Sequence, residues 1–173
     1  TLFRSQMYVT GGLGPTNTNE GFTFAYDAFG QMINFSQILI GTDDTSDEIL
    51  LSIDYSYDLA GNILVRDAGE LGIMRYSYDA FSRPIRIEFN DDWIEIDYNL
   101  NGWRTTIRRS NGVETRYSYD PNGRVRNLVH INADDVRLDG FAYDYDASGN
   151  LIRVTRSDNW AILYSYDAAE QLT

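Results

Sequence analysis

The sequence predicts an all-β fold: an antiparallel meander of tandem β-hairpin repeats that forms a long twisted or spiralling sheet. Two observations predict it. A motif, aromatic-x-Tyr-Asp-x-x-Gly, occurs in seven versions within 173 residues and contains 12 of the 13 tyrosines. Most copies also follow one another at a common spacing of 20 or 21 residues, as expected for one structural unit that is repeated. A residue type confined to one periodic position is placed there by architecture.

The aromatic pair and the residues after it mark each copy of the motif. The copies start at residues 24, 55, 76, 96, 117, 143 and 164. The second aromatic recurs every 20 or 21 residues, apart from steps of 31 and 26 residues. We attribute the longer steps to loop insertions at 41–48 and 132–135. The predicted structural positions are Tyr26, Asp27, Gly30, Tyr55, Tyr57, Asp58, Gly61, Tyr76, Tyr78, Asp79, Tyr98, Gly102, Tyr117, Tyr119, Asp120, Gly123, Tyr143, Tyr145, Asp146, Gly149, Tyr164, Tyr166 and Asp167.

Each repeat is interpreted as strand, tight turn and strand. Residues 117–119 alternate aromatic and small polar side chains, which is the period of a strand with one packed face. In the turn that follows, Asp120 can accept backbone N–H groups, Pro121 presets φ, and Gly123 tolerates positive φ. Residues 124–128 then form the returning strand.

A second turn links each repeat to the next. Asn111-Gly112 lies between two alternating segments and is a strong hairpin signal, and residues 90–92 and 157–159 occupy equivalent places. Residues 1–21 are predicted to be an irregular N-terminal segment with an edge strand, and 22–173 one continuous array of about seven repeats. No segment indicates a helix.

These motifs resemble the YD-repeat, or Rhs-repeat, family. Residues 55–63, 117–125 and 143–151 are similar to its Tyr-x-Tyr-Asp-x-x-Gly-Arg/Asn-Leu signature, and the resemblance runs from about residue 24 to 173. Departures are Asn99 in place of Asp, Ser82 and Glu170 in place of Gly, and Pro84 and Arg104 in place of an aliphatic residue. They put three of the turns in question, the third, fourth and seventh.

The resemblance implies a structural role. Repeats of this family build a sheet that spirals into a hollow shell, which in bacterial toxin complexes and polymorphic toxins surrounds a toxic C-terminal segment. Related sheets occur in animal cell-surface adhesion proteins. Because full shells are far longer, the resemblance implies a segment of one, or a short member that closes its edges by assembling.

Composition narrows the classes of partner. With 14 basic and 26 acidic residues, the net charge of −12 disfavours nucleic acid and anionic membrane surfaces. The absence of cysteine excludes disulfides and thiolate metal sites. No apolar run approaches the length of a membrane span. The start has no signal-peptide layout and no initiator Met, so we expect a removed leader or a piece of a longer chain.

Each candidate for chemistry has a simpler structural interpretation. Asp120-Pro121 could be a self-cleaving pair, but it lies within an ordinary repeat turn. His130, the one histidine, lies on an alternating strand without a nucleophile motif around it. The repeat aspartates are equivalent to one another, whereas paired acid/base chemistry needs one special pair. We therefore interpret them as turn caps.

Three further candidates are a metal loop, an aromatic platform and a sequon. Four acidic side chains could bind Ca²⁺, although without EF-hand spacing a solvated loop is favoured; they are Asp43, Asp44, Asp47 and Glu48. Three tryptophans could stack on a glycan if they shared an exposed face, but sheet packing is favoured; they are Trp93, Trp103 and Trp160. Residues 34–36 form a glycosylation sequon, relevant in a eukaryotic secretory setting.

The sequence therefore favours a non-enzymatic shell or scaffold segment that encloses a toxin cargo or forms a secreted surface structure. The alternatives are a subunit that assembles edge to edge into an extracellular filament or tube, and a glycan-binding adhesion module. No cofactor or metal is expected. The expected partners are neighbouring repeats or identical chains through sheet edges, with a toxin cargo or glycan. The expected location is secreted or at the cell surface.

Overall fold

The structure is a computed structural model that describes residues 3–7, 20–39 and 48–173. These residues form 14 β-strands and one short 3₁₀ turn. The chain divides into two compact units, the first ending at Asp91 and the second beginning at Asp92. The predicted fold class, an all-β antiparallel meander of tandem hairpins, is confirmed.

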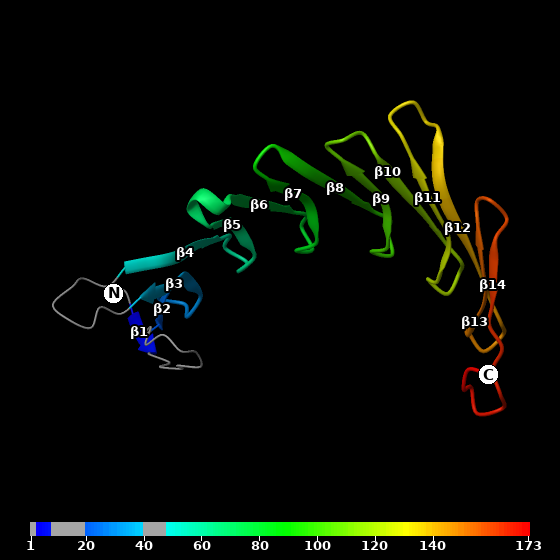
Figure 1. Ribbon diagram of the computed structural model, residues 1–173, viewed down its shortest axis with the longest axis horizontal. Coiled ribbons are helices and arrows are strands. Elements are labelled where there is room, and N and C mark those ends of the chain that lie inside the picture. The colour runs from blue at the N-terminus through cyan, green and yellow to red at the C-terminus, as the bar shows by residue number, and fades with distance from the viewer. Residues whose placement is uncertain (1–2, 8–19, 40–47) are drawn as a thin grey trace, which may run out of the picture. The chain divides into compact units, whose positions relative to one another are not determined.

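The first unit is a meander in which each strand pairs antiparallel with the next one along the chain. Figure 1 draws its strands from blue to green. They are β1 (Phe3–Met7), β2 (Glu20–Tyr26), β3 (Met32–Leu39), β4 (Glu48–Tyr57), β5 (Ile63–Asp67), β6 (Ile73–Tyr78) and β7 (Pro84–Phe89).

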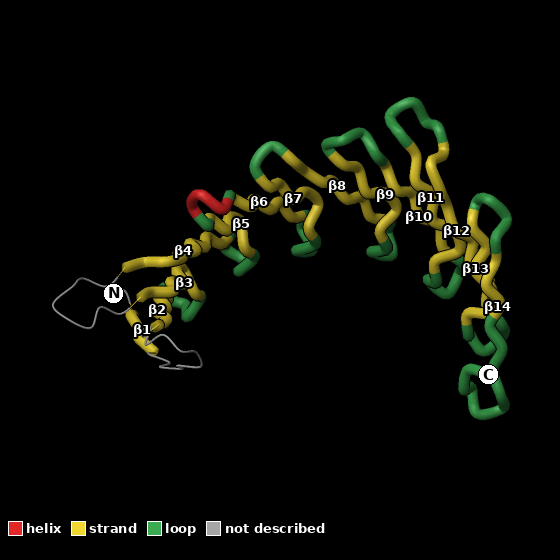
Figure 2. Tube along the Cα trace, viewed as in Figure 1, coloured by secondary structure: helices red, strands yellow, loops and turns green. Residues whose placement is uncertain are grey.

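The second unit has the same plan, again with sequential antiparallel pairs. Figure 2 shows its loops gathered at the two ends of the strands. The strands are β8 (Asp92–Tyr98), β9 (Arg104–Arg109), β10 (Glu114–Tyr119), β11 (Val125–Ile131), β12 (Arg137–Tyr145), β13 (Leu151–Arg156) and β14 (Ala161–Leu163).

Strand β10 shows why these residues form sheet. Thr115, Tyr117 and Tyr119 alternate along the strand with more polar neighbours and therefore lie on one face. Thr115 is fully buried, whereas Arg116 and Ser118 on the other face are exposed. We call the face that carries the motif aromatics the tyrosine face. It is the better covered side of β10.

The core is thin because each unit is built on one layer of strands. The described residues contain four buried hydrophobic side chains, Ile53, Ile96, Ile107 and Ile131. Ile96 and Ile107 are register partners on β8 and β9, and Ile107 is the partner of Thr115 on β10. This strip on the tyrosine face replaces the second layer that most domains use to bury apolar surface.

The two longer spacings between repeats, of 31 and 26 residues, have different explanations in the structure. Most of the acidic insertion at 41–48 lies outside the described residues, as do residues 8–19 of the N-terminal segment. The loop at 132–135 is a short turn, not an insertion, which corrects the sequence interpretation. The extra length lies in β11 and β12, which have 7 and 9 residues against 6 in β9, β10 and β13.

One linker departs from the hairpin pattern. Between β5 and β6 the chain makes a 3₁₀ turn, η1 (Gly69–Leu71), although the sequence indicated no helix. The turn begins after Ala68, whose N–H donates to the carbonyl of Gly72 at 3.0 Å. A segment this short has no helical periodicity to detect.

Candidate functional site

The repeated turn is held by one oxygen of the motif aspartate. In the fifth repeat, Asp120 Oδ1 accepts the backbone N–H groups of Asn122 at 2.9 Å and Arg124 at 3.0 Å. The N–H of Gly123 donates to the Asp120 carbonyl at 3.0 Å, and Gly123 has φ of 82°. This is the three-residue hairpin loop in which a type I turn precedes a left-handed residue and a bulge.

All seven motif turns share this geometry, so the predicted turn positions come together within each repeat. A side-chain oxygen of the first turn residue accepts the N–H four positions later at 2.8–3.0 Å; the first residues are Asp27, Asp58, Asp79, Asn99, Asp120, Asp146 and Asp167. Asn99 does this with its amide oxygen. Ser82 and Glu170 take the left-handed position with φ of 59° and 60°. The turn therefore forms with Asn99, Ser82 and Glu170 in place of the family's residues.

The second carboxylate oxygen bonds to the side chain that follows the turn. Arg83 donates to Asp79 Oδ2 at 2.6 Å, and Arg124 donates to Asp120 Oδ2 at 2.7 Å. The hydrogen bond from the Arg83 side chain holds the pKa of Asp79 below its ordinary value. Burial opposes this effect at Asp120, but the bonds from Arg124 outweigh it, so the pKa of Asp120 is also lowered.

The second tyrosine of a repeat joins it to the preceding repeat. Tyr119 donates its hydroxyl to the Arg104 carbonyl at 2.7 Å, and Tyr145 donates to the Val125 carbonyl at 2.9 Å. The same bond joins Tyr57 to Met32, Tyr78 to Ile63 and Tyr166 to Leu151. In each case the acceptor lies five positions after the first turn residue of the preceding repeat. We call these bonds the phenol latches.

The tyrosine hydroxyls of the phenol latches stay protonated at neutral pH. Burial is the main cause that raises the pKa of the Tyr119 and Tyr145 phenols above 10.0. A neutral phenol is the form that can donate to a carbonyl. These tyrosines therefore act as hydrogen-bond donors to the backbone.

In the part of the chain that the structure describes, the second tyrosines of neighbouring repeats do not stack on one another. Tyr57, Tyr78, Tyr119 and Tyr145 recur on every second strand, and among the described residues none of these four rings stacks on another. Trp103 covers Tyr119 with ring centroids 5.2 Å apart. The Arg124 guanidinium lies 4.5 Å from the centroid of the Tyr145 ring. The side chains that lie against these tyrosines therefore come from residues directly before the intervening strands β9 and β11.

A polar chain that the sequence did not indicate crosses β9, β10 and β11. Arg109 donates to Thr115 Oγ1 at 2.8 Å, and the same oxygen lies 2.9 Å from Nδ1 of His130. Thr115 has no exposed surface, so no substrate can reach this hydroxyl. The contact gives His130 a hydrogen-bond partner on the neighbouring strand.

Asp139 is a second group that sequence reasoning missed. Its carboxylate accepts bonds from Arg156 at 2.9 Å and Ser157 at 2.8 Å. The Arg156 bond is the largest cause that holds the Asp139 pKa far below its ordinary value. These contacts join β12 to the last residue of β13 and to the turn after it. Asp139 lies outside the repeat motif, so no periodicity marks it.

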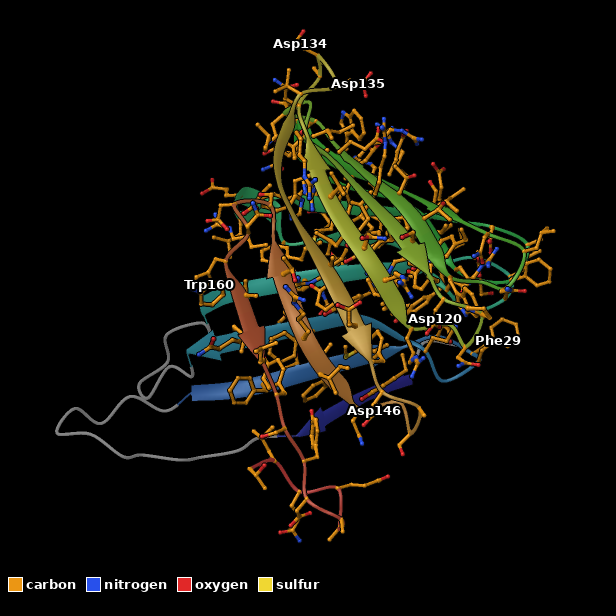
Figure 3. All side chains as sticks on the ribbon, turned by 90° about the vertical axis from the view of Figure 1, so that its right-hand side faces the viewer. Phe29, Asp120, Asp134, Asp135, Asp146 and Trp160 are labelled. Carbon is orange, nitrogen blue, oxygen red and sulfur yellow. The ribbon has the colours of Figure 1, made fainter. Side chains whose placement is uncertain are left out.

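The two ends of the strands carry different turns. Figure 3 shows Asp120 and Asp146 at one end of the second unit and Asp134 and Asp135 at the other. Trp103 directly follows a motif turn, whereas Trp160 lies on the linking turn after β13 and is exposed. The two indoles therefore lie at opposite ends of their strands and form no shared platform. Trp93 lies on β8 and is half-buried.

Three candidates from the sequence remain: the Asp-Pro pair, the glycosylation sequon and the acidic loop. Pro121 occupies the first loop position of an intact motif turn. Asn34 of the sequon donates its side-chain amide to Ser52 at 2.9 Å and Asp54 at 2.7 Å, within paired strands. The side chains of the proposed Ca²⁺ loop, Asp43 to Glu48, lie outside the described residues. Elsewhere in the described ranges, no group of three potential metal ligands occurs.

Large apolar side chains stand on four consecutive motif turns. Each is at least 79% exposed: Phe29, Leu59, Phe81 and Leu100. The turn geometry does not require them, because Asn122 and Ser148 occupy similar loops. In the described part of the chain, no helix has the length and hydropathy to cross a bilayer.

Comparison with known proteins agrees with the predicted resemblance. Residues 98–135 and 145–173 match the family model described as RHS Repeat. The toxin protein Tse5 of Pseudomonas aeruginosa is 29% identical over 176 residues, a match that covers 99% of this chain and 12% of Tse5. The chain therefore spans about an eighth of this relative.

Solved structures share the fold. The crystal structure of TcdB2-TccC3 superposes with a TM-score of 0.69 at 19% identity, covering 85% of this chain and 9% of that one. The Tc holotoxin pore of Photorhabdus luminescens gives 0.66 at 17% identity, covering 99% of this chain and 11% of that one.

Proposed function

Because the chain carries RHS repeats, we propose that it is a structural segment of an RHS-repeat shell that encloses a toxic segment of a longer, secreted or surface-delivered protein. It acts through shape and is not itself an enzyme. The partners of the segment are neighbouring repeats along the sheet and the enclosed cargo.

The equivalence of the repeats carries this proposal. Every motif aspartate accepts a backbone N–H of its own turn. The phenols of five motif tyrosines donate to a backbone carbonyl of the preceding repeat. Such bonds hold backbone groups that would otherwise remain unpaired. A catalytic site needs one group that differs from its copies, and the motif supplies none.

The relatives support the shell and the cargo. Tse5 is named a toxin, and the structural neighbours belong to a toxin complex. Each is many times longer than this chain. A segment of this size can form part of a wall, and enclosure needs the rest of the polypeptide.

The test uses the full-length protein that contains this segment. Electron cryomicroscopy is expected to show a closed hollow particle in which these strands form part of the wall. Limited proteolysis should leave an internal segment uncut in the intact particle and degrade it once urea opens the sheet. Fibres or open tubes in place of closed particles would support edge-to-edge assembly and overturn the enclosure.

The non-enzymatic part of the proposal is tested separately. The isolated segment is assayed for hydrolase and transferase turnover against panels of esters, peptides and glycosides. We expect no turnover above buffer. Turnover that disappears on one substitution in a chain that still folds would refute it.

A further inference from the structure

The irregular linker of the first unit builds a small apolar pocket. Its volume is about 150 Å³, and it lies between the 3₁₀ turn and strands β4 to β7. Leu71 comes from the turn, Ile53 from β4 and Met74 from β6, and Phe89 closes the far side. The pocket therefore occurs where the hairpin pattern is interrupted.

The wall of the pocket depends on a glycine. A Cβ at Gly72 would lie 2.7 Å from the Phe89 ring, so the ring packs directly against the backbone. Gly72 also has φ of 114°, a conformation that other residues rarely adopt. Any larger residue would push Phe89 inward or outward. The shape of the pocket is thus set by backbone and ring together.

One cation faces this apolar surface. Arg66 on β5 is the register partner of Met74, which is the partner of Phe89, so the three share the tyrosine face. The Arg66 guanidinium donates to the Met74 sulfur at 3.8 Å, a weak acceptor. Within the described residues it has no carboxylate partner.

Arg66 differs in this respect from the arginines that form ion pairs with a carboxylate. The described arginines Arg83, Arg108, Arg124 and Arg156 each contact an aspartate, and acidic residues outnumber basic ones by 26 to 14. A half-buried guanidinium that lacks an anion loses hydration without compensation. An anion supplied from outside would restore that balance.

We propose that this pocket binds a carboxylate attached to a single apolar ring or branched chain. A cavity of about 150 Å³ accommodates one benzene-sized group. The ring lies against Ile53, Leu71 and Phe89, and the carboxylate accepts hydrogen bonds from Arg66. The proposal does not depend on the shell, since the pocket belongs to one unit.

The probe is 3-phenylpropanoate, with binding followed by chemical-shift changes and calorimetry at low salt. Its matched controls are 3-phenylpropanol, which lacks the charge, and 2-phenylethylamine, which reverses it. We expect the acid to bind about tenfold or more tightly than either control, because a charge-assisted hydrogen bond is lost. Equal binding of the three, or no binding of the acid, overturns the proposal.

The matched variants are Arg66→Met and Arg75→Met. Arg75 is exposed and lies on the opposite face of β6, next to Met74. Arg66→Met should weaken acid binding by about tenfold or more, and Arg75→Met by less than about twofold. Equal loss in both variants would contradict a specific contact. The ligand-side comparison in the unaltered protein decides the matter if Arg66→Met fails to fold.

A second arm distinguishes a free acid from a polypeptide end. A short peptide ending in phenylalanine is compared with its C-terminal amide. Binding of the free peptide alone, at least as tight as that of 3-phenylpropanoate, identifies a polypeptide terminus as the source of the same chemistry. Binding of the small acid without the peptide identifies a free aromatic acid.

Discussion

Gly123 shows how one position can be required for two independent reasons. Its φ of 82° completes the motif turn, and a Cβ there would lie 2.6 Å from Cζ2 of Trp103. Gly30 occupies the same turn position with φ of 80°, but nothing lies within 4 Å of its Cβ direction. The two glycines therefore separate backbone strain from packing.

We expect Gly123→Ala to destabilise the protein more than Gly30→Ala. The left-handed backbone costs each variant about 1–2 kcal/mol. The clash with Trp103 adds about 1–3 kcal/mol to Gly123→Ala alone. Urea denaturation of both variants measures the difference.

Removing the indole supplies the control. In a Trp103→Ala background, Gly123→Ala should cost about as much as Gly30→Ala, because only the backbone term remains. An unchanged excess cost would show that the Trp103 contact is not its cause.

Residue chemistry was the part of the site that sequence could predict. Asp120 and Gly123 define a turn through interactions within five residues, so their roles follow from local rules. The Trp103 contact with Gly123 joins positions 20 residues apart, and the acceptor of the Tyr119 hydroxyl depends on strand register. Neither is encoded in a short motif. The pocket at Arg66 escaped prediction because it arises where the repeat fails.

At the scale of the element, the phenol latches connect one hairpin to the next. Tyr119 and Tyr117 lie on the same strand and face. Of these two, Tyr119 alone has a hydroxyl that bonds to a backbone carbonyl of the described residues. Removing the hydroxyl from each tyrosine in turn therefore compares a bonded phenol with a second phenol on the same strand.

We expect Tyr119→Phe to lower the free energy of unfolding by about 0.5–1.5 kcal/mol, because the Arg104 carbonyl loses its donor. Tyr117→Phe should change it by less than about 0.5 kcal/mol. Chemical denaturation at neutral pH measures both. Similar losses in the two variants would argue against the latch.

The same bond predicts that the protein loses stability at alkaline pH. The folded-state pKa of Tyr119 is raised, so its contribution is complete below the ordinary phenol value of 10.0 and is lost as pH rises through the higher folded value. The unaltered protein should therefore lose more stability above pH 10 than Tyr119→Phe does. Parallel curves would contradict this.

The motif turns predict that the protein also loses stability at acid pH, through their aspartates. The folded pKa of Asp120 is lowered, so its contribution is present above the ordinary carboxyl value of 3.8 and is lost as pH falls through the lower folded value. Asp120→Asn should fold, because Asn99 holds the same turn with an amide oxygen. Its stability should fall less between pH 5 and 2, as measured by thermal unfolding. An identical acid slope would exclude Asp120 as a contributor.

At the scale of the whole molecule, strands contact their sequence neighbours. In both units every described pair joins consecutive strands. Repeat proteins with this organisation have stabilities that are sums of local and nearest-neighbour terms. Damage in one repeat is therefore expected to remain local.

Hydrogen exchange tests this expectation with Gly123→Ala. Amides of β10 and β11, which flank the altered turn, should exchange faster, and those of β2 and β3 should keep their rates. A uniform rise across both units would show that the chain unfolds as one cooperative body.

The phenol latches also have a direction. In every one the hydroxyl belongs to the later repeat and the carbonyl to the earlier one. A ribosome releases the acceptor first, in a hairpin whose own turn is already complete. Each newly made repeat then bonds to a repeat that is already folded, so the sheet can grow in the order in which it is translated.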